Sequence, residues 1–173
     1  MGGDDPPDLT DAQRGLVIAA LDRALANESI LLLETRKMQW DVGGAQALTL
    51  HQLWTGQVRE MSDLADTVAA RIRALGGYPT ATATGFVELT SLEEHPGCVP
   101  SATAAVCILV ADHERVLQEL EGAAAAAEGA RDHGTASIVA TLIQRHERMA
   151  DMLRPFVADS AHAPEGTPSA PAA

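Results

Sequence analysis

The chain has 173 residues and a formal net charge of −12, with 46% hydrophobic but only 3% aromatic residues. This length suffices for one domain with a sizeable core, which has to be built from aliphatic side chains. No segment has the length and apolarity of a membrane span. The acidic charge, with one lysine in the whole chain, argues against direct binding to duplex DNA, whose phosphates proteins neutralise with Lys and Arg.

The first predicted element is a long helix. Residues 1–9 are rich in Gly, Pro and Asp and lack the basic and apolar parts of a secretory signal, so we expect a flexible acidic segment of a cytoplasmic protein. Thr10 and Gln13 have the spacing of a capping box. Apolar residues recur at helical spacing from there to Trp40, and Gly43–Gly44 is expected to end the helix.

A second long helix is predicted to begin near Thr49 and to run to about Leu75, where Gly76–Gly77 and Pro79 stop it. Residues 78–99 contain turn formers, and a short helix is expected within this crossover. A third long helix is predicted from Pro100–Ser101 to about residue 128.

A fourth long helix is predicted from about Thr135 to Val157, after a turn at residues 132–134. Residues 159–173 are rich in Pro and Ala and are expected to be disordered, which leaves residues 10–158 as the folded domain.

Two hairpin-linked pairs of long helices joined by a long crossover predict an all-α fold, a ferritin-like four-helix bundle with a short helix between its second and third long helices. An up-down bundle would not need so long a second connection. The alternative is a four-helix protein of another family with an incidental loop insertion.

Residues 37–79 carry a family resemblance, in the segments KMQWDVGG, ALTLHQLW and DLADTVAARIRALGGYP. They resemble the core signature of the Dps mini-ferritins, and LVADHERVLQEL (109–120) and QRHERMADMLRPF (144–156) resemble the patterns of the later helices. The resemblance spans about residues 10–157. It implies a homo-oligomeric, dodecameric cage that stores iron, oxidises Fe(II) with peroxide and protects against oxidative stress.

The resemblance also implies an iron site at each two-fold interface, with His51 from one chain and Asp66 from its partner. Fifteen residues separate these two along one helix, about 22 Å, so a single chain cannot bring both to one ion. Gln39, Thr55 and Ala70 stand where the family has a histidine and two acids. Gln39 and Thr55 are weak ligands for Fe(II), and Ala70 offers none.

We therefore expect a degraded ferroxidase site in which Fe(II) oxidation is weak or absent. Two alternatives stay open: a non-catalytic cage or interaction protein, and an interface pocket that binds another metal or a small ligand. Trp40 and Trp54 could line such a pocket, although core packing is their ordinary explanation. His51 could equally be a structural residue, and Asp66 could pair with a nearby arginine.

Other polar residues have ordinary explanations. His113 and His146 lie close to apolar stripes and are expected to be buried, hydrogen-bonded structural histidines. Cys98 and Cys107 form no CxxC pair, and Cys107 is expected to be a small core residue. The segment ARDHGTAS (130–137) resembles the family's three-fold pore, which makes Asp132, with Glu128 nearby, a candidate pore acid that draws cations inward; an ordinary capped turn is the alternative.

Overall fold

The structure, a computed structural model, describes residues 9–160, and side chains as far as residue 157. The predicted all-α bundle is confirmed, including the short helix in the crossover. No helix in the described part of the chain is long and apolar enough to cross a membrane. The predicted terminal segments lie largely outside the described residues. The helices are α1 (Asp11–Asp41), α2 (Ala47–Ala74), α3 (Ala83–Leu89), α4 (Ala102–Gly129) and α5 (His133–Ser160).

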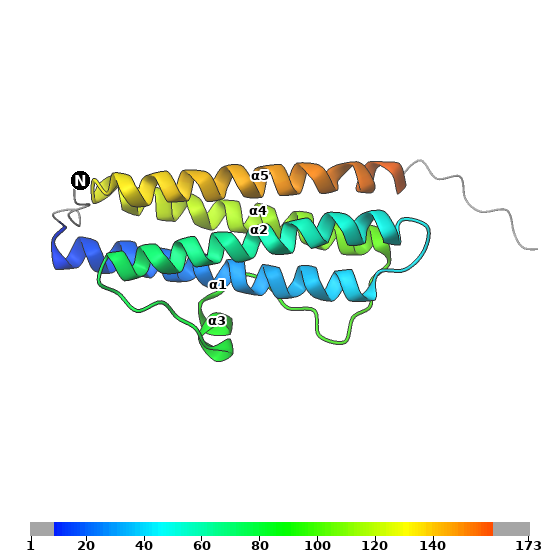
Figure 1. The fold of residues 1–173 in the computed structure, drawn as a ribbon, viewed down its shortest axis with the longest axis horizontal. Helices are drawn as coiled ribbons and strands as arrows, with labels where there is room; N and C mark the ends of the chain where they lie inside the picture. Colours follow the sequence, from blue (N-terminus) through cyan, green and yellow to red (C-terminus); the bar gives the residue numbers. More distant parts are fainter. Residues whose placement is uncertain (1–8, 161–173) are drawn as a thin grey trace, which may run out of the picture.

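The four long helices lie side by side, and the crossover runs back along the outside of the bundle (Figure 1). α1 and α2 form one antiparallel hairpin and α4 and α5 the other. Because α2 and α4 run in the same direction, the chain has to travel most of the length of the bundle between them (Figure 1). A helix of 28 residues is about 42 Å long, which explains why residues 75–101 form a long connection.

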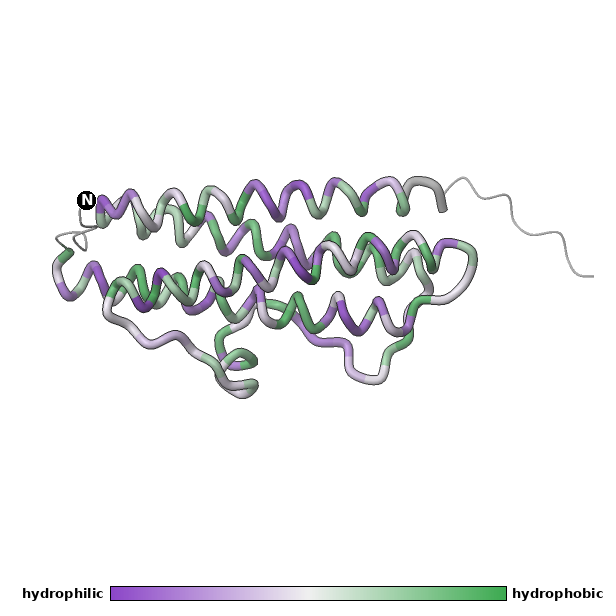
Figure 2. Tube along the Cα trace, viewed as in Figure 1, coloured by the Kyte–Doolittle hydropathy of each residue, from purple (hydrophilic) through white to green (hydrophobic). Residues whose placement is uncertain are grey.

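The core is aliphatic, as the composition predicts. Apolar and polar residues alternate along each long helix (Figure 2), and the apolar stripes of all four meet inside the bundle. Trp54 is fully buried in this core, and Leu9, just before α1, also belongs to it. Cys107 is exposed, so the expectation that it is a core residue is wrong.

Helix ends agree with their sequence signals in most places. The Thr10–Gln13 capping box is present, and Gly76, with φ of 84°, follows the end of α2. Gly77 allows close packing, because an added Cβ would lie 2.9 Å from a methyl group of Ile72. α2 begins at Ala47, close to the predicted start near Thr49, and its N-cap residue Gln46 makes no side-chain capping bond.

Polar side chains of α1 fasten the crossover along its course. They follow one another at intervals of one to two helical turns on the side of α1 that faces the crossover, so the connection is held at several points rather than only at its ends. The links are Asp22 with the Thr80 N–H, Asn27 with Thr90 and Ser91, Glu34 with His95, and Lys37 with the Cys98 carbonyl oxygen.

Asp132 ties the end of α2 to the start of α5. Its buried carboxylate accepts hydrogen bonds from the Thr135 N–H (3.0 Å) and hydroxyl (2.5 Å) and from the Arg71 guanidinium (2.5 Å). Burial by itself raises the pKa of Asp132, but the hydrogen bonds from Thr135 and the charge of Arg71 outweigh it and lower the pKa below 3.8. The ionised carboxylate is therefore part of the native fold.

Replacing Asp132 by alanine should destabilise the protein by about 2–4 kcal/mol at pH 7, because it removes a helix cap and leaves Arg71 without its partner. The folded-state pKa of Asp132 lies below the unfolded one, so this advantage of the parent should be lost as the pH falls below about 4. Urea unfolding at pH 7 and below pH 4 measures the free energy of unfolding of the parent and of the variant. Glu128→Ala, an exposed acid in the preceding turn, is the control, and an equal loss in both variants would contradict the assignment.

Candidate metal centre

The predicted interfacial ligands from α1 and the start of α2 lie together. The Gln39 side-chain amide donates to the Thr55 hydroxyl oxygen (2.5 Å) and to the His51 carbonyl oxygen (3.1 Å). The Thr55 hydroxyl in turn donates to the same carbonyl oxygen (2.7 Å). The Gln39 amide nitrogen and the Thr55 hydroxyl are therefore bonded to one another, and they join the end of α1 to the start of α2.

Asp66 lies farther along α2, as the helical geometry requires. Both His51 and Asp66 are exposed, and Asp66 makes no ion pair with any described residue. Arg73 is a nearby arginine that could pair with Asp66. It instead donates to the Gly77 carbonyl oxygen and lies over the Tyr78 ring. Within one chain, His51 and Asp66 are two free polar groups rather than a site.

The two tryptophans have different roles. Trp40 is 73% exposed beside the Gln39 cluster, whereas Trp54 is fully buried. Core packing is therefore the right explanation for Trp54 and the wrong one for Trp40. Leu48, at the start of α2, is also largely exposed. Two large apolar side chains are thus exposed at the end of the α1–α2 hairpin that carries His51.

The residues present at these positions do not fit tight binding of iron. One imidazole, one amide oxygen and one hydroxyl come from one chain, and one carboxylate would come from another. Ala70 contributes no ligand, and it is exposed. Among residues 9–160, no three His, Cys, Asp or Glu side chains stand in an arrangement that could hold a metal ion.

The two candidate pore acids differ in their surroundings. Asp132 is 1% exposed and bonded to Arg71 and Thr135, while Glu128 is exposed one turn earlier. Within the chain, Asp132 is thus a capping residue. A role for Glu128 in a pore depends on neighbouring chains and stays a prediction.

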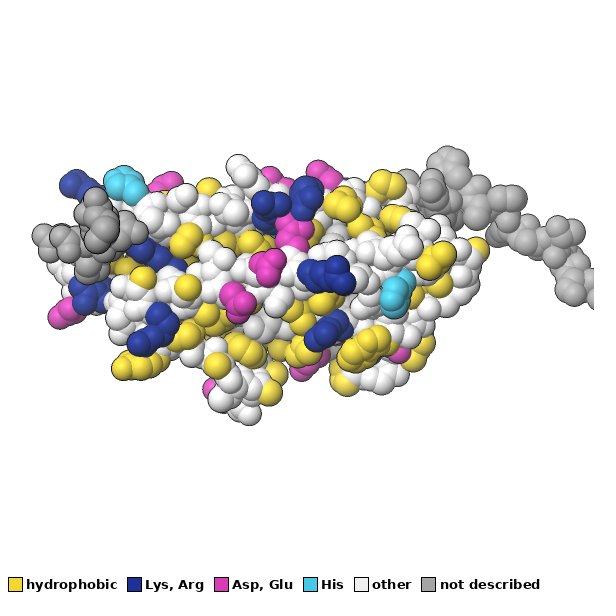
Figure 3. Space-filling model, in the orientation of Figure 1, with side chains coloured by type: hydrophobic (Ala, Val, Ile, Leu, Met, Phe, Trp, Pro, Cys, Tyr) yellow, Lys and Arg dark blue, Asp and Glu magenta, His cyan; other side chains and the backbone are white. Residues whose placement is uncertain are grey.

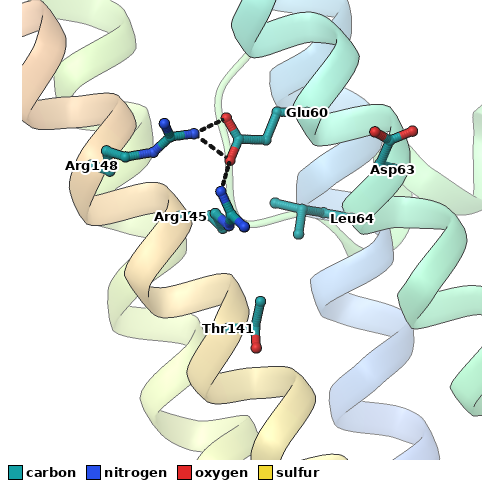
Figure 4. A pocket seen from close by; sticks show the side chains of 6 residues that line it. All are labelled: Glu60, Asp63, Leu64, Thr141, Arg145 and Arg148. Atoms are coloured by element: carbon teal, nitrogen blue, oxygen red, sulfur yellow. Dashed lines mark hydrogen bonds and ion pairs between the residues drawn. The ribbon is translucent and has the colours of Figure 1, made fainter.

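A surface pocket of about 380 Å³ lies between α2 and α5 (Figure 4). Arg145 and Arg148 reach from α5 to the Glu60 carboxylate on α2, the first at 3.2 Å, while Asp63 points away from them (Figure 4). Because the two guanidinium groups neutralise Glu60, this carboxylate cross-links the helices and offers no free ligand for a cation. On the face shown in Figure 3, acidic and basic side chains intermingle and the basic ones form no continuous patch.

A second acidic cluster lies between α1, α4 and the crossover. Glu34 Oε1 is 2.9 Å from His95 Nδ1, and Asp112 on α4 is nearly buried close to this pair. Burial first, and then the Glu34 carboxylate, raise the pKa of Asp112 from 3.8 to about 6, against an opposing effect of His95. Asp112 is therefore a buried acid of the bundle rather than a charge surrounded by water.

The centre of the bundle holds ionisable side chains from three helices. His113 Nδ1 on α4 is 2.9 Å from His146 Nδ1 on α5, and His146 Nε2 is 2.6 Å from Glu28 Oε1 on α1. All three side chains are 0% exposed. The prediction that both histidines are buried and hydrogen-bonded is confirmed. Burial first, and then His146, lower the pKa of His113 to about 3, so it is neutral at pH 7.

Glu28 is the functional candidate that sequence reasoning missed. It lies in the apolar stripe of α1, one turn after Ala24 and one turn before Leu31, both of which are buried. An acid at such a position needs a partner inside the bundle, and His146 of α5 is that partner here. The helical spacing of Glu28 with these buried apolar residues was the signal in the sequence that it is buried.

The pKa of Asp112 gives a test of its burial. Its folded-state pKa lies above the unfolded one, so the folded state keeps this proton from about pH 4 to pH 6, and stability falls as the pH rises through that interval. Asp112→Asn should therefore be more stable than the parent at pH 8, by on the order of 1 kcal/mol, and equally stable at pH 4. Urea unfolding at both pH values measures this. Glu121→Gln, an exposed acid on the same helix, should show no such pH-dependent gain; a similar gain there would overturn the explanation.

Comparison with known proteins supports one family. The ferritin-like domain model matches residues 18–161. A low temperature-induced protein of Nostoc is 42% identical over 160 residues, 92% of this chain and 89% of that protein. The DNA protection during starvation protein of Brevibacillus brevis is 32% identical over 82% of this chain and 95% of its own. The crystal structure of a Dps protein from Bacillus brevis superposes with a TM-score of 0.82 at 30% identity, covering 86% of this chain and 99% of that one. The chain belongs to the ferritin-like family and, within it, to the Dps mini-ferritins.

Proposed function

We propose that the chain is the subunit of a dodecameric Dps-type cage that binds and stores iron in the cytoplasm and protects against oxidative stress. Its relatives include proteins named for DNA protection during starvation and for low-temperature induction, which supports a stress role. The proposal assigns to this chain a weakened iron site between subunits. The observation that carries this assignment is the hydrogen-bonded Gln39–Thr55 pair beside His51.

Assembly follows from the placement of the two remaining ligands. His51 and Asp66 lie on one straight helix, about 22 Å apart along its axis, and both are exposed. Only a second copy of the chain, packed antiparallel, brings the Asp66 of one subunit to the His51 of another. The exposed Trp40 and Leu48 next to His51 supply the apolar surface that such contact would bury.

The net negative charge of the chain favours cations over DNA as the ligands of the proposed cage. A net charge of −12 per chain, repeated over an assembled shell, attracts Fe(II) and repels nucleic acid. Iron could then be deposited on interior acids even when the interfacial site oxidises it slowly. In the oxidation itself, hydrogen peroxide accepts one electron from each of two Fe(II) ions and two protons from the solvent; its O–O bond breaks and it leaves as two water molecules.

Oxidation is slow in this proposal because the site lacks negative charge. A carboxylate stabilises Fe(III) more than Fe(II), and the site keeps one carboxylate, Asp66, after the replacements at Thr55 and Ala70. The Gln39 amide nitrogen is engaged with Thr55, and its amide oxygen is a neutral ligand that holds iron more weakly than an imidazole does. The same observation favours a second candidate function, a cage without ferroxidase activity that serves as a structural or interaction protein.

Restoring the missing groups should restore activity. The variant Gln39→His/Thr55→Glu/Ala70→Glu adds one imidazole and two carboxylates at the family positions, and we expect Fe(II) oxidation by peroxide to rise at least roughly tenfold over the parent. Anaerobic Fe(II) titration and stopped-flow absorbance near 300 nm measure binding and oxidation, each against a protein-free control.

Asp66→Asn in the restored background is the matched control and should abolish the gain, because the partner's carboxylate is then lost. A parent that already oxidises Fe(II) as fast as the restored variant would contradict the degraded site. A parent and a restored variant that both fail to exceed the protein-free control, although light scattering shows a dodecamer, would favour the cage without ferroxidase activity.

A further inference from the structure

The links that hold the crossover to α1 differ in how they depend on pH. Those of Asp22 and Asn27 reach main-chain N–H and hydroxyl groups, which keep their protons at any pH near neutrality. The link between Glu34 and His95 instead joins two ionisable side chains, with Oε1 and Nδ1 2.9 Å apart. The strength of this link therefore depends on the charges and protons around it.

Asp112 of α4 adds a third ionisable side chain to the Glu34–His95 link. The Glu34 and Asp112 residues are only 7% and 9% exposed, and Asp112 Oδ2 is buried without a hydrogen-bond partner among the described residues. An ionised carboxylate in such surroundings is costly unless it is paired. The neutral form of Asp112 is therefore favoured as long as the crossover covers the cluster.

Two charges act on Asp112: the Glu34 carboxylate raises its pKa, after burial, and His95 lowers it. Other ionisable side chains of the helices packed around it are bonded to different partners, and Glu93 and Glu94 of the crossover are exposed. The pairs are Lys37 with Asp41 on α1, Arg115 with Glu119 on α4, Glu28 of α1 with His146 of α5, and Glu114 of α4 with Arg154 of α5.

We propose that Glu34, His95 and Asp112 form a pH-operated latch, which holds residues 92–99 of the crossover against α1 and α4 in acid and loosens them when Asp112 loses its proton. In acid, a neutral Asp112 does not repel Glu34, and His95 stays bonded to Glu34. At higher pH the two carboxylates repel one another, and water reaches both when the segment lifts away. Leu92, which packs into the core, leaves it in the same movement.

The latch acts on a surface that carries exposed apolar side chains. Lys37 holds the end of the segment through the Cys98 carbonyl oxygen. Val99, the next residue, is 72% exposed, and Trp40, about one turn after Lys37, is 73% exposed. Loosening residues 92–99 therefore changes the apolar surface at this end of the bundle. The latch does not rest on the proposed iron site, because it needs neither a metal ion nor a second chain.

The direction and size of the effect follow from proton linkage. The pKa of Asp112 is about 6 beneath the closed segment, and a carboxylate in water has the ordinary value of 3.8. Because the closed state has the higher pKa, its extra stability is fully present below pH 4 and is lost as the pH rises through 6. With these two values, the population of the loosened segment should rise roughly tenfold between pH 5 and pH 8.

Hydrogen–deuterium exchange of the assembled protein, followed by mass spectrometry at pH 5 and pH 8, measures this loosening after correction for the intrinsic exchange rate. The amides of Leu92 and Cys98 are hydrogen-bonded and report on the latch. We expect protection in peptides from residues 92–99 to be roughly tenfold lower at pH 8 than at pH 5. Peptides from residues 80–91, held by the pH-independent links, are the internal control and should change less than roughly threefold.

Three variants separate Asp112 from other causes of a pH effect. Asp112→Asn keeps the shape of the side chain but cannot ionise, so the loss of protection at pH 8 should disappear. Glu121→Gln, an exposed acid on the same helix, is the matched control and should behave as the parent does. Glu34→Gln removes the carboxylate that raises the pKa of Asp112 and should give a smaller pH effect than the parent, which keeps the latch testable if Asp112→Asn does not fold.

Equal protection of residues 92–99 at both pH values in the parent would overturn the latch. So would a loss of protection in Asp112→Asn as large as in the parent, or an equal loss in residues 80–91. These results are separable from a failure of the proposed function, because the exchange is measured without iron and Fe(II) oxidation does not enter it.

Discussion

The architecture depends on α1, because this one helix holds both the bundle and the crossover. One side of α1 packs against α2 and α4, and polar side chains on another side bind the connection that runs past it. Asn27 is typical: its side-chain oxygen accepts from the Ser91 N–H at 2.9 Å and from the Thr90 hydroxyl at 2.8 Å. A bundle in which α2 and α4 run parallel needs such a fixed return path, and here α1 provides it.

The same helix carries polar side chains in two different surroundings. Gln39 stands near the exposed end of α1, where water competes for every ligand and only a second chain could complete the site. Glu28 stands in the dry middle of the bundle, where an unpaired charge is costly, and it is bonded there to His146.

Sequence reasoning succeeded where a local signal has a local consequence. The Thr10–Gln13 box and the glycine at position 76 fixed helix ends because capping bonds and positive φ values involve only neighbouring residues. It could place the start of α2 only approximately, near Thr49, because this helix begins without a side-chain cap. It was wrong for Cys107, because an apolar stretch of helix has an outer side as well as an inner one.

Long-range pairing explains the remaining differences. Asp132 has the sequence appearance of a free acid, but Arg71, 61 residues earlier, and Thr135 enclose it. Glu28 could not be paired with His146 from the sequence, since 118 residues separate them and the choice among buried histidines depends on how the helices rotate against one another. Contacts between chains, which decide the role of His51, depend on residues that no single chain brings together.

The central claim is that the iron site between subunits has lost most of its ligands and binds iron weakly. Anomalous diffraction from crystals of the assembled protein soaked anaerobically in Fe²⁺ tests it most directly, because the map locates each ion. The account predicts a weak peak or none between His51 and the partner subunit's Asp66 in the parent, and a strong peak there in Gln39→His/Thr55→Glu/Ala70→Glu. A strong peak at this interface in the parent would contradict it.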